Sequence, residues 1–431
     1  MILRDAVHGL VSFEGEEESV IEALMDAPEM QRLRRIRQLG VASVAFPGAE
    51  HTRFSHAVGA AWVMKKLIGR LRGLHEDLPF WQRVTSDRAR DALAAAMLHD
   101  LGHGPLSHLF EDALPGSPHH EVWTERIVLE PRTGVNAILT AIDPAMPDRV
   151  AALVRGVHPL PYLAKAVSGT LDVDRCDYLL RDAHSTGVRY GLFDLDWLLR
   201  SLRFSPSTEG TAPGLAIDGA KGLPAIEGFI LARLFMFQQV YLHKATRAAE
   251  WMIRTALARA SHLLSDGLRL AGTPKAMVDA ARGADVKLDD YLELDDAALA
   301  VAMRDWERSL DRPLADLCLR VRSRTLFKTY ELFGELAGEK GREEAHHVAR
   351  DIARQAGKDP DVYVGIDVAE VIPYEETDPL LVVFQKGAPR PLSEVSFLLG
   401  RLAGQRLSRT RLIVAHELRD QVAAALATRN G

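Results

Sequence analysis

The chain has 431 residues, of which 47% are hydrophobic and 26% are charged, and this is the composition of an ordinary soluble globular protein. A net charge of −6 gives no general attraction to nucleic acid or to anionic membranes, so an anionic ligand requires local basic groups. The two cysteines, Cys176 and Cys318, exclude a disulfide framework and are typical of a reducing compartment. Because neither a secretory signal nor an apolar run of membrane length is found, we expect a cytoplasmic protein without membrane association.

The first seventy residues predict helices that lead to a histidine at the start of an apolar helix. Short helices are expected near Glu18–Met25 and, in basic sequence, near Met30–Gln38. A helix with many apolar positions follows from Ala57 to about Leu71, so His56 lies at or near the start of a buried helix. For His56 alone, a capping or core role is as good an interpretation as a functional one.

The most informative stretch is His99-Asp100, which is followed by His103 and His108 and comes after the small-residue helix predicted over 91–98. Adjacent residues on a helix point about 100° apart, so this histidine and aspartate can still reach one ion. Glycine and proline at 102, 104 and 105 end the helix. An imidazole nitrogen beside a carboxylate oxygen suits a catalytic divalent transition metal. The alternative is a buried helix end whose histidines satisfy backbone groups, and it is disfavoured because burying so many polar groups without a role is costly.

A helix predicted from about residue 172 carries a second polar face. Asp174, Tyr178 and Asp182 lie at i, i+4 and i+8, with Arg175 and Arg181 at the margins of their face. Such a face is usually a solvated surface. Acidic, phenolic and guanidinium groups together are also what a site for a metal and a phosphate needs.

The rest of the chain predicts a mostly α protein with a small α+β unit at its end. One long helix is expected over 224–264, and it is so apolar that it must belong to the core or to a subunit interface. A change of composition near 337–343 predicts a boundary between a helical core, residues 1–336, and an α+β domain, residues 337–431. In that domain we expect helices over 344–356, 393–403 and 417–427, and strands over 362–368, 380–385 and 411–415.

The separated polar clusters have a common explanation. His56, His99-Asp100 and Asp174 provide two imidazoles and two carboxylates from three helices, which leaves open positions on an octahedral metal. A divalent metal lowers the pKa of bound water and polarises a phosphoryl oxygen, so a hydrolytic site of this kind needs no covalent nucleophile. We expect one divalent ion, and the sequence does not distinguish among Mn, Mg, Fe, Ni and Zn.

These residues reproduce an H…HD…D signature, and the chain resembles the HD-domain metal-dependent phosphohydrolases. The resemblance is closest to the deoxynucleoside triphosphate triphosphohydrolase branch, which includes the animal SAM- and HD-domain enzyme. The shared blocks follow the family's order and are DAVHG (5–9), QRLRRIRQLG (31–40), FPGA (46–49), HTRFSH (51–56), HDLGHGPLSH (99–108), DVDRCDY (172–178) and YLHK (241–244). The resemblance covers roughly residues 1–250 and implies an HD-domain helical core, and the small α+β unit follows that core.

The resemblance also implies a role for each matching residue. The metal ligands would be His56, His99, Asp100 and Asp174. The residues around the α-phosphate would be His103, His108 and His120. His120 would be the general acid for the leaving sugar oxygen, and its carboxylate partner is Glu111 where the animal enzyme has Asp. Substrate-binding positions would be Gln38, Leu39, Arg53, Arg175, Tyr178, Asp182, Arg233, Tyr241, His243 and Lys244.

The reaction implied is hydrolysis of a dNTP to a deoxynucleoside and triphosphate. Two alternatives are the same chemistry on another nucleotide (a nucleoside monophosphate, a modified or a signalling nucleotide) and a nucleotide-sensing module without turnover. A nuclease or single-strand binder is disfavoured by the net charge of −6. The family forms dimers and tetramers, so a homodimer or homotetramer is expected. The basic stretch 320–328 is interpreted as a solvated helix face in preference to an activator site.

Overall fold

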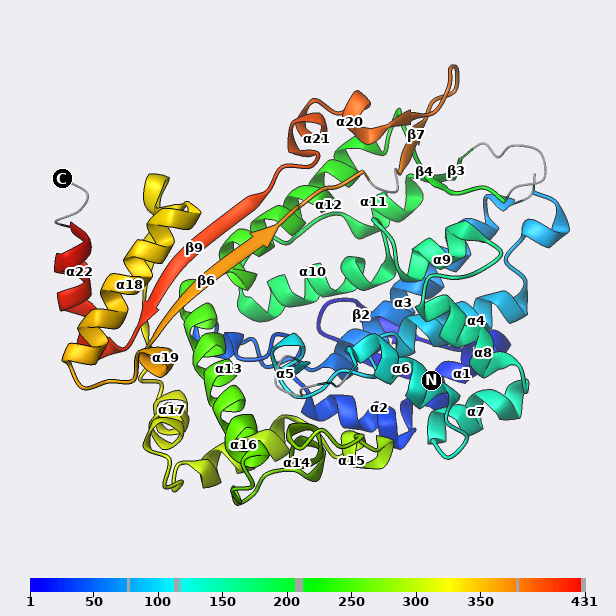
Figure 1. The fold of residues 1–431 in the computed structure, drawn as a ribbon. Coiled ribbons are helices and arrows are strands. Elements are labelled where there is room, and N and C mark those ends of the chain that lie inside the picture. Colours follow the sequence, from blue (N-terminus) through cyan, green and yellow to red (C-terminus); the bar gives the residue numbers. More distant parts are fainter. Residues whose placement is uncertain (76–77, 112–115, 117, 206–211, 377–379, 428–431) are drawn as a thin grey trace.

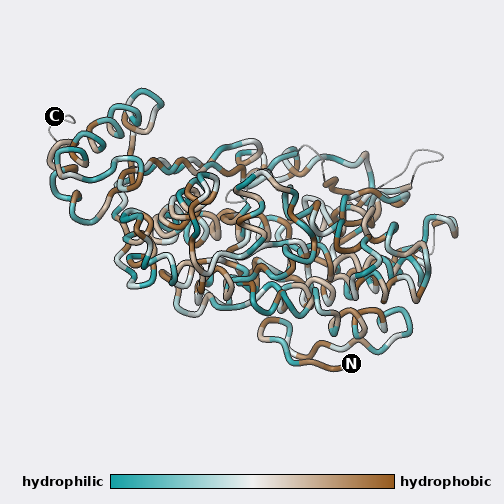
Figure 2. Tube along the Cα trace, turned by 60° about the horizontal axis from the view of Figure 1, so that its bottom comes forward, coloured by the Kyte–Doolittle hydropathy of each residue, from teal (hydrophilic) through white to brown (hydrophobic). Residues whose placement is uncertain are grey.

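The computed structural model describes residues 1–431 except 76–77, 112–115, 117, 206–211, 377–379 and 428–431. The chain forms an elongated, mostly helical body, and its C-terminal helices project at one end (Figures 1 and 2). Within the described residues, three small sheets accompany the helices. The predicted class, mostly α with some β, is confirmed.

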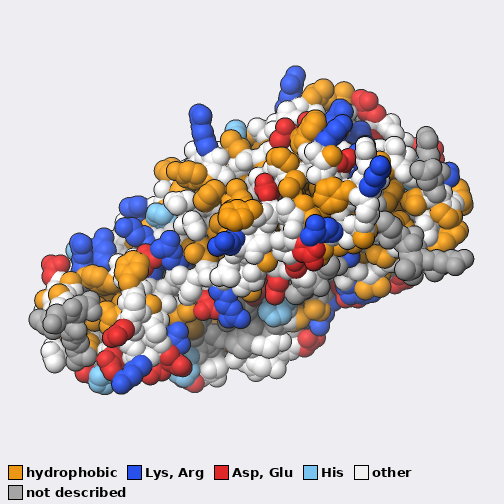
Figure 3. Space-filling model, turned by 90° about the horizontal axis from the view of Figure 1, so that it is seen from above, with side chains coloured by type: hydrophobic (Ala, Val, Ile, Leu, Met, Phe, Trp, Pro, Cys, Tyr) orange, Lys and Arg blue, Asp and Glu red, His pale blue; other side chains and the backbone are white. Residues whose placement is uncertain are grey.

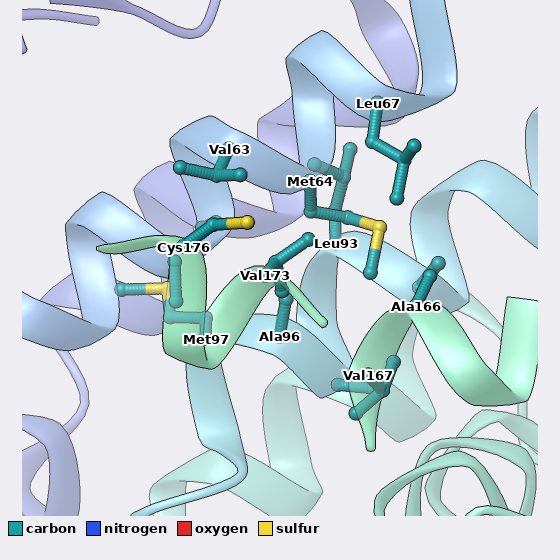
Figure 4. Close-up of a cluster of buried hydrophobic side chains, with 14 of the residues drawn as sticks. Val63, Met64, Leu67, Leu93, Ala96, Met97, Ala166, Val167, Val173 and Cys176 are labelled. Atoms are coloured by element: carbon teal, nitrogen blue, oxygen red, sulfur yellow. The ribbon is translucent and has the colours of Figure 1, made fainter. Parts of the chain in front are cut away.

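Three helices form the centre of the body and carry the predicted metal ligands. They are α3 (Arg53–Arg72), α4 (Ser86–Leu98) and α10 (Val173–Thr186), and α3 packs against both of the others (Figure 1). Figure 4 shows their apolar side chains interdigitating with two from α9 (Pro161–Val167). The side chains labelled there are buried, and they are Val63, Met64, Leu67, Leu93, Ala96, Met97, Ala166, Val167, Val173 and Cys176. Close packing of this kind fixes the helix ends relative to one another.

Local sequence explains where these helices begin and how closely they approach. Thr85 caps α4 by accepting a hydrogen bond from the Arg88 N–H, and Asp172 caps α10 in the same way. Gly59 of α3 faces α10, where a Cβ atom at this position would clash with the side chains of Asp177 and Arg181. Only glycine therefore allows this approach of α3 and α10.

The other helices of the N-terminal half surround this centre and are short. They are α1 (Ser19–Met25), α2 (Pro28–Arg32), α5 (His108–Glu111), α6 (His120–Leu129), α7 (Gly134–Ile142), α8 (Met146–Val154) and α11 (Leu195–Arg200). A hairpin of β1 (Ile2–Asp5) and β2 (Gly9–Ser12), which the sequence did not predict, precedes them.

The basic helix predicted to reach Gln38 ends earlier. After α2 the chain makes one 3-10 turn, Leu33–Arg35, and then runs antiparallel to residues 51–53. The Gln38 N–H donates to the carbonyl of His51 at 3.0 Å, and the Arg53 N–H donates to the carbonyl of Ile36 at 2.9 Å. These tertiary bonds replace helical ones and turn the segment toward the central helices.

The prediction of one continuous helix over 224–264 is wrong. The segment forms α12 (Leu223–Met236), a π-helix η6 (Phe237–Tyr241) and α13 (Lys244–Ser265). The part formed by α12 and η6, Leu223–Tyr241, is bent by 61° relative to α13. The His243 side chain accepts from the Ala245 N–H at 3.3 Å and so caps α13 as a new helix.

The apolar character of this segment is explained by burial within the chain. Most apolar residues of α12 and one face of α13 are buried. Among the described residues, no single helix is long and apolar enough to cross a membrane. The bent pair reaches that length and composition only when its two parts are counted together.

After α11, the described part of the chain adds further helices and two sheets. The helices are α14 (Lys275–Ala281), α15 (Leu288–Leu292), α16 (Asp296–Trp306), α17 (Arg312–Arg322), α18 (Glu339–Gln355), α19 (Pro360–Tyr363), α20 (Leu392–Val395), α21 (Phe397–Leu402) and α22 (Arg419–Ala427). One antiparallel sheet has the order β5 (Lys328–Leu332), β9 (Leu407–Val414), β6 (Val364–Val371). The other has the order β3 (Leu202–Phe204), β4 (Leu215–Asp218), β7 (Leu381–Val383), β8 (Arg390–Pro391).

The strands and helices predicted after residue 337 are confirmed within a few residues, except that 393–403 forms two short helices, α20 and α21. The two larger sheets each join strands from both sides of residue 337, because β5 pairs with β9 and β4 pairs with β7. The boundary at 337 stays a prediction.

Candidate functional site

Three side chains from three helices meet at one point. The Nε2 atom of His56 lies 3.0 Å from Oδ1 of Asp174 and 3.4 Å from Nε2 of His99, and this His99 atom lies 3.4 Å from the same Asp174 oxygen. Two imidazole nitrogens and a carboxylate oxygen are a donor set for a divalent transition metal. The three ligand atoms are close enough to hold one ion. The structure thus brings these three predicted metal ligands together.

Asp100 lies beside this trio and faces a second group. Its Oδ1 is 3.5 Å from Nε2 of His99 and 3.3 Å from Nε2 of His103, while its Oδ2 is paired with Arg53. Together with His103 and His120 it forms another set of ligand atoms within 4.8 Å of one another. Burial opposes the charge of Asp100, but Arg53 and His99 outweigh this and hold its pKa well below the usual range.

A buried carboxylate that the sequence analysis did not single out orients His56. Asp177 is fully buried and accepts hydrogen bonds from Nδ1 of His56 at 2.8 Å, from Nε2 of His8 at 2.7 Å and from Arg181 at 2.8 Å. A proton held on Nδ1 by this carboxylate leaves the Nε2 lone pair facing the trio. Burial raises the pKa of Asp177, but Arg181 and the histidines lower it well below its usual value. The signal was present in the sequence as a second aspartate three residues after Asp174.

The turn after α4 is held against α6 by polar contacts. Nδ1 of His99 lies 2.9 Å from the carbonyl of Ala96, which directs Nε2 toward the trio. The Thr124 hydroxyl accepts from the Gly102 N–H at 2.9 Å and donates to the carbonyl of His99 at 3.1 Å. A Cβ atom at Gly102 would clash with the backbone of α6, so glycine is required for this contact. The contact also fixes the start of α6, where His120 lies.

Leu106 and Ser107, after this turn, adopt left-handed backbone conformations, with φ of 55° and 59°. Such conformations are strained in residues other than glycine and need surrounding contacts. The Leu106 N–H donates to Asp296 at 2.9 Å, and the Ser107 hydroxyl accepts from Arg53 at 2.7 Å. The strained turn therefore fixes Arg53, whose guanidinium is buried beside Asp100.

The predicted general acid is paired with its predicted carboxylate. Nδ1 of His120 lies 2.6 Å from Oε1 of Glu111, whose other oxygen lies 3.0 Å from Nδ1 of His119. The rings of His103 and His120 stack at 3.7 Å between centroids with an interplanar angle of 15°. Burial and the charge of Arg53 lower the pKa of His103 well below its usual value, so His103 stacks as a neutral ring. His108 begins α5, and its side chain lies outside the part of the chain that is described.

A cavity of about 600 Å³ is bounded by several of these residues. Tyr178 connects it to the trio, since its ring lies 6.5 Å from that of His56 in an edge-on arrangement. The predicted site residues that line this cavity are Gln38, Leu39, Arg53, Glu111, Tyr178, Asp182 and Tyr241.

Asp182 and Tyr241 are joined at the cavity wall. Asp182 accepts from the Tyr241 hydroxyl at 2.8 Å, and its other oxygen lies 2.8 Å from Nε2 of His51. Two further polar atoms at the cavity, Oε1 of Gln38 and Oγ1 of Thr246, are buried and have no hydrogen-bond partner among the described residues. Buried polar atoms are normally hydrogen-bonded, so these two are suited to a polar ligand.

Four predicted substrate-binding residues do not line this cavity. Arg175 and Arg233 line a neighbouring cavity of about 350 Å³, next to residues 372–375. Arg233 donates to the carbonyl of Pro373 at 2.6 Å. His243 caps α13, and Lys244 is exposed to solvent. The bend between η6 and α13 gives His243 and Lys244 directions that a continuous helix would not.

The α13 wall of the cavity was missed from the sequence. Thr246, Arg247, Glu250 and Arg254 line the cavity. Their spacing along one helical face was visible in the sequence, but polar residues at such spacing are more often a solvated face.

Comparisons with known proteins agree with this geometry. The family model described as HD domain matches residues 53–182, and the model described as HD associated region matches residues 193–271 and 270–429. The protein YwfO of Bacillus subtilis is 32% identical over 97% of this chain and 92% of its own length. A deoxynucleoside triphosphate triphosphohydrolase SAMHD1 homolog of Dictyostelium discoideum is 27% identical over 82% of this chain, which spans 64% of that protein. The crystal structure of a phosphohydrolase from Bacteroides thetaiotaomicron has a TM-score of 0.79 and 28% identity, covering 96% of this chain and 99% of that one.

Proposed function

The chain belongs to the HD-domain phosphohydrolase family, and from this premise we propose that it hydrolyses dNTPs to a deoxynucleoside and triphosphate. Membership rests on the HD-domain match over 53–182 and on the relative that is 32% identical over 97% of the chain. The dNTP substrate is supported by the likeness to the Dictyostelium discoideum protein, of which the chain spans 64%.

One observation carries the proposal: the trio of ligand atoms adjoins a cavity of about 600 Å³ whose wall holds both a buried guanidinium and a carboxylate. Ligand cavities for small molecules have this size and combine apolar walls with a few polar groups. Arg53 at the trio suits a phosphate, because a guanidinium binds phosphate oxygens with two parallel hydrogen bonds. Asp182, further along the wall, suits a sugar hydroxyl.

The donor chemistry of the trio fits a divalent metal, which His56, His99 and Asp174 would hold with Asp100 beside them. When bound, a divalent metal supplies Lewis-acid chemistry and activated water. Because the net charge of the chain is −6, the negative charge of a phosphate requires a local basic group, and Arg53 would be that group.

The leaving sugar oxygen needs a proton, and His120 would give one. Glu111, at 2.6 Å from its Nδ1, would stabilise the charged ring and leave the Nε2 proton for transfer. His103, stacked on His120 as a neutral ring, would position it. Glu111, the last residue of α5, reaches hydrogen-bond distance of His120 at the start of α6.

We also propose that the chain forms a homodimer or homotetramer. Figure 3 shows hydrophobic side chains on the upper face of the body, where α12 and α21 lie. Large apolar side chains there and on α11 are exposed, with 81% of Phe397, 45% of Trp197 and 39% of Phe235 accessible. Such patches are typical of interfaces. Light scattering should give two or four times the chain mass of 47.6 kDa. A mass of 47.6 kDa at micromolar concentration would reject this proposal.

A substrate panel tests the proposed reaction. The purified chain with Mn²⁺ or Mg²⁺ is incubated with each dNTP and each NTP, and the products are separated by chromatography. We expect triphosphate and a deoxynucleoside in equal amounts, because attack at the α-phosphorus releases both together. Release of no triphosphate from any dNTP would overturn the substrate assignment and leave the family assignment intact.

A further inference from the structure

We propose that the α13 end of the cavity recognises the nucleobase and that Glu250 selects guanine there. This inference rests on the proposed function, because it places the base of a nucleotide substrate in the same cavity.

The walls of the cavity differ between its two ends. The end next to the trio has Arg53, Glu111 and Tyr178. Along α13 the lining is Thr246, Arg247, Glu250 and Arg254, which come from successive turns of one helix face. A substrate whose phosphates lie at the trio and whose sugar lies at Asp182 therefore extends its base toward α13.

The cavity also has apolar wall residues. Val240 and Leu242 precede α13, and Val41, Ala42 and Leu109 line the same cavity. Their elements face one another, because α5 and the turn Ala42–Val44 both pack against α13 (Figure 1). Apolar groups on facing elements provide a slot that suits the faces of a planar base.

Thr246 supplies independent evidence that a polar ligand belongs at this end. Only 3% of the residue is accessible, its Oγ1 has no hydrogen-bond partner among the described residues, and it lines the cavity. A buried hydroxyl in a native fold normally has a partner. A nucleobase at the α13 end would supply that partner through its ring edge.

Glu250 is held in place from the C-terminal sheet. Arg247 donates to Oε2 of Glu250 at 2.7 Å and to Oδ1 of Asp367 on β6 at 2.5 Å. The carboxylate of Glu250 is therefore fixed before a ligand binds, which reduces the entropy lost on binding. Burial raises the pKa of Glu250 above its usual value, and the charges of Arg247 and Arg254 offset only part of that rise.

The chemistry of a fixed carboxylate distinguishes the four bases. Guanine presents its N1–H and its 2-amino group side by side, and these two donors match the two oxygens of Glu250. Adenine and cytosine present one amino group next to a ring nitrogen acceptor, which a carboxylate repels, and thymine presents one N–H between two carbonyls. On the other edge of guanine, O6 and N7 accept from a guanidinium such as that of Arg254.

Steady-state kinetics with dGTP, dATP, dCTP and dTTP test the proposal on the wild type and on Glu250→Gln. We expect dGTP to be preferred, and we expect the variant to lose about tenfold in kcat/KM for dGTP, mainly through KM, with little change for dATP. Glu250→Asp should restore part of the preference. Glu343→Gln, the same change at an exposed position of α18, is the matched control and should have no effect. Equal rates with all four substrates, or an equal loss for all four in Glu250→Gln, would overturn the proposal while the proposed function stands.

Calorimetry with the four deoxynucleosides separates this inference from the proposed reaction. Deoxyguanosine should bind the wild-type chain more tightly than the other three, and Glu250→Gln should lose this difference even if no dNTP is hydrolysed. Equal binding of the four deoxynucleosides, or binding of none, would reject a guanine site.

Discussion

The substitution Asp177→Asn tests how the metal site is held. Asp177 is fully buried and lies beneath the trio, where it accepts from His56, His8 and Arg181. An asparagine has nearly the same shape but only one acceptor oxygen, and its amide group cannot accept from the other donors. The change therefore removes charge and hydrogen bonds from His56 with little change of volume.

The magnitude follows from the contacts that are lost. Breaking a buried ion pair and leaving one partner charged costs about 3–5 kcal/mol. Arg181 keeps a second partner, since it also donates to Asp5 at 2.8 Å, so we expect the lower end of that range. Loss of a carboxylate that orients a metal-binding histidine typically lowers metal affinity by about 10–100-fold. The folded Asp177→Asn variant should therefore bind metal more weakly than the wild type, in addition to its loss of stability.

Asp5→Asn is the matched control, because Asp5 contacts Arg181 but not His56. Urea unfolding measures the stability of both variants, and Mn²⁺ titration measures their affinity for metal. We expect both variants to lose stability and only Asp177→Asn to lose metal affinity. Wild-type Mn²⁺ affinity in folded Asp177→Asn, or an equal loss of affinity in both variants, would refute the orienting role of Asp177.

Three further predictions follow from the same structure. Asp174→Ala should remove the metal and abolish hydrolysis without unfolding the chain, as judged by metal analysis and circular dichroism. Retained activity would contradict the role of the trio as the metal site. Glu111→Gln should lower kcat by about 10²–10⁴-fold with unchanged metal content, because His120 loses the carboxylate that supports its charge; an unchanged kcat would remove His120 as the acid. Burial raises the pKa of Glu417, but hydrogen bonding from Arg320 outweighs this and lowers the pKa from 4.5 to about 2. Its ion pair therefore stabilises the fold above pH 4.5 by at most about 1 kcal/mol and is lost as the pH falls toward 2. Glu417→Gln should accordingly be less stable than the wild type in urea at pH 7 and equally stable near pH 2, and a difference that persists there would contradict the pairing.

The sequence predicts that the three residues of the trio lie near helix ends, because each is close to the start or end of a helix with a buried apolar face. His56 and His99 follow from the periodicity of α3 and α4, and Asp174 follows from the polar face of α10. Helix packing, which includes the close contact of α3 with α10 at Gly59, then brings the three helix ends together. The sequence alone does not show which helices are neighbours.

The remainder of the site depends on contacts that no local pattern encodes. The π-helix at Phe237–Tyr241 interrupts the stretch 229–266, which has neither proline nor glycine, and it accompanies a hydrogen bond between Tyr241 and Asp182. Because α13 starts anew after this bend, Thr246 and Glu250 line the cavity while Lys244 is exposed. Neither outcome follows from helical periodicity, which treats the segment as one straight helix.

The basic stretch 320–328 illustrates the same limit. Arg320 makes two hydrogen bonds to Glu417, at 3.0 and 2.8 Å, across 97 residues of sequence. Arg322 pairs with Glu307, and Lys328 begins β5. Because Arg320 and Arg322 are paired with carboxylates of the chain itself, part of the positive charge of this stretch is neutralised without a bound nucleotide.

The central claim is that His56, His99 and Asp174 hold one divalent cation. Crystals grown with Mn²⁺ and measured at a wavelength where manganese scatters anomalously test it directly. We predict a single strong peak in contact with Nε2 of His56, Nε2 of His99 and a carboxylate oxygen of Asp174. No peak at saturating Mn²⁺, or a peak bound by other residues only, would contradict the claim.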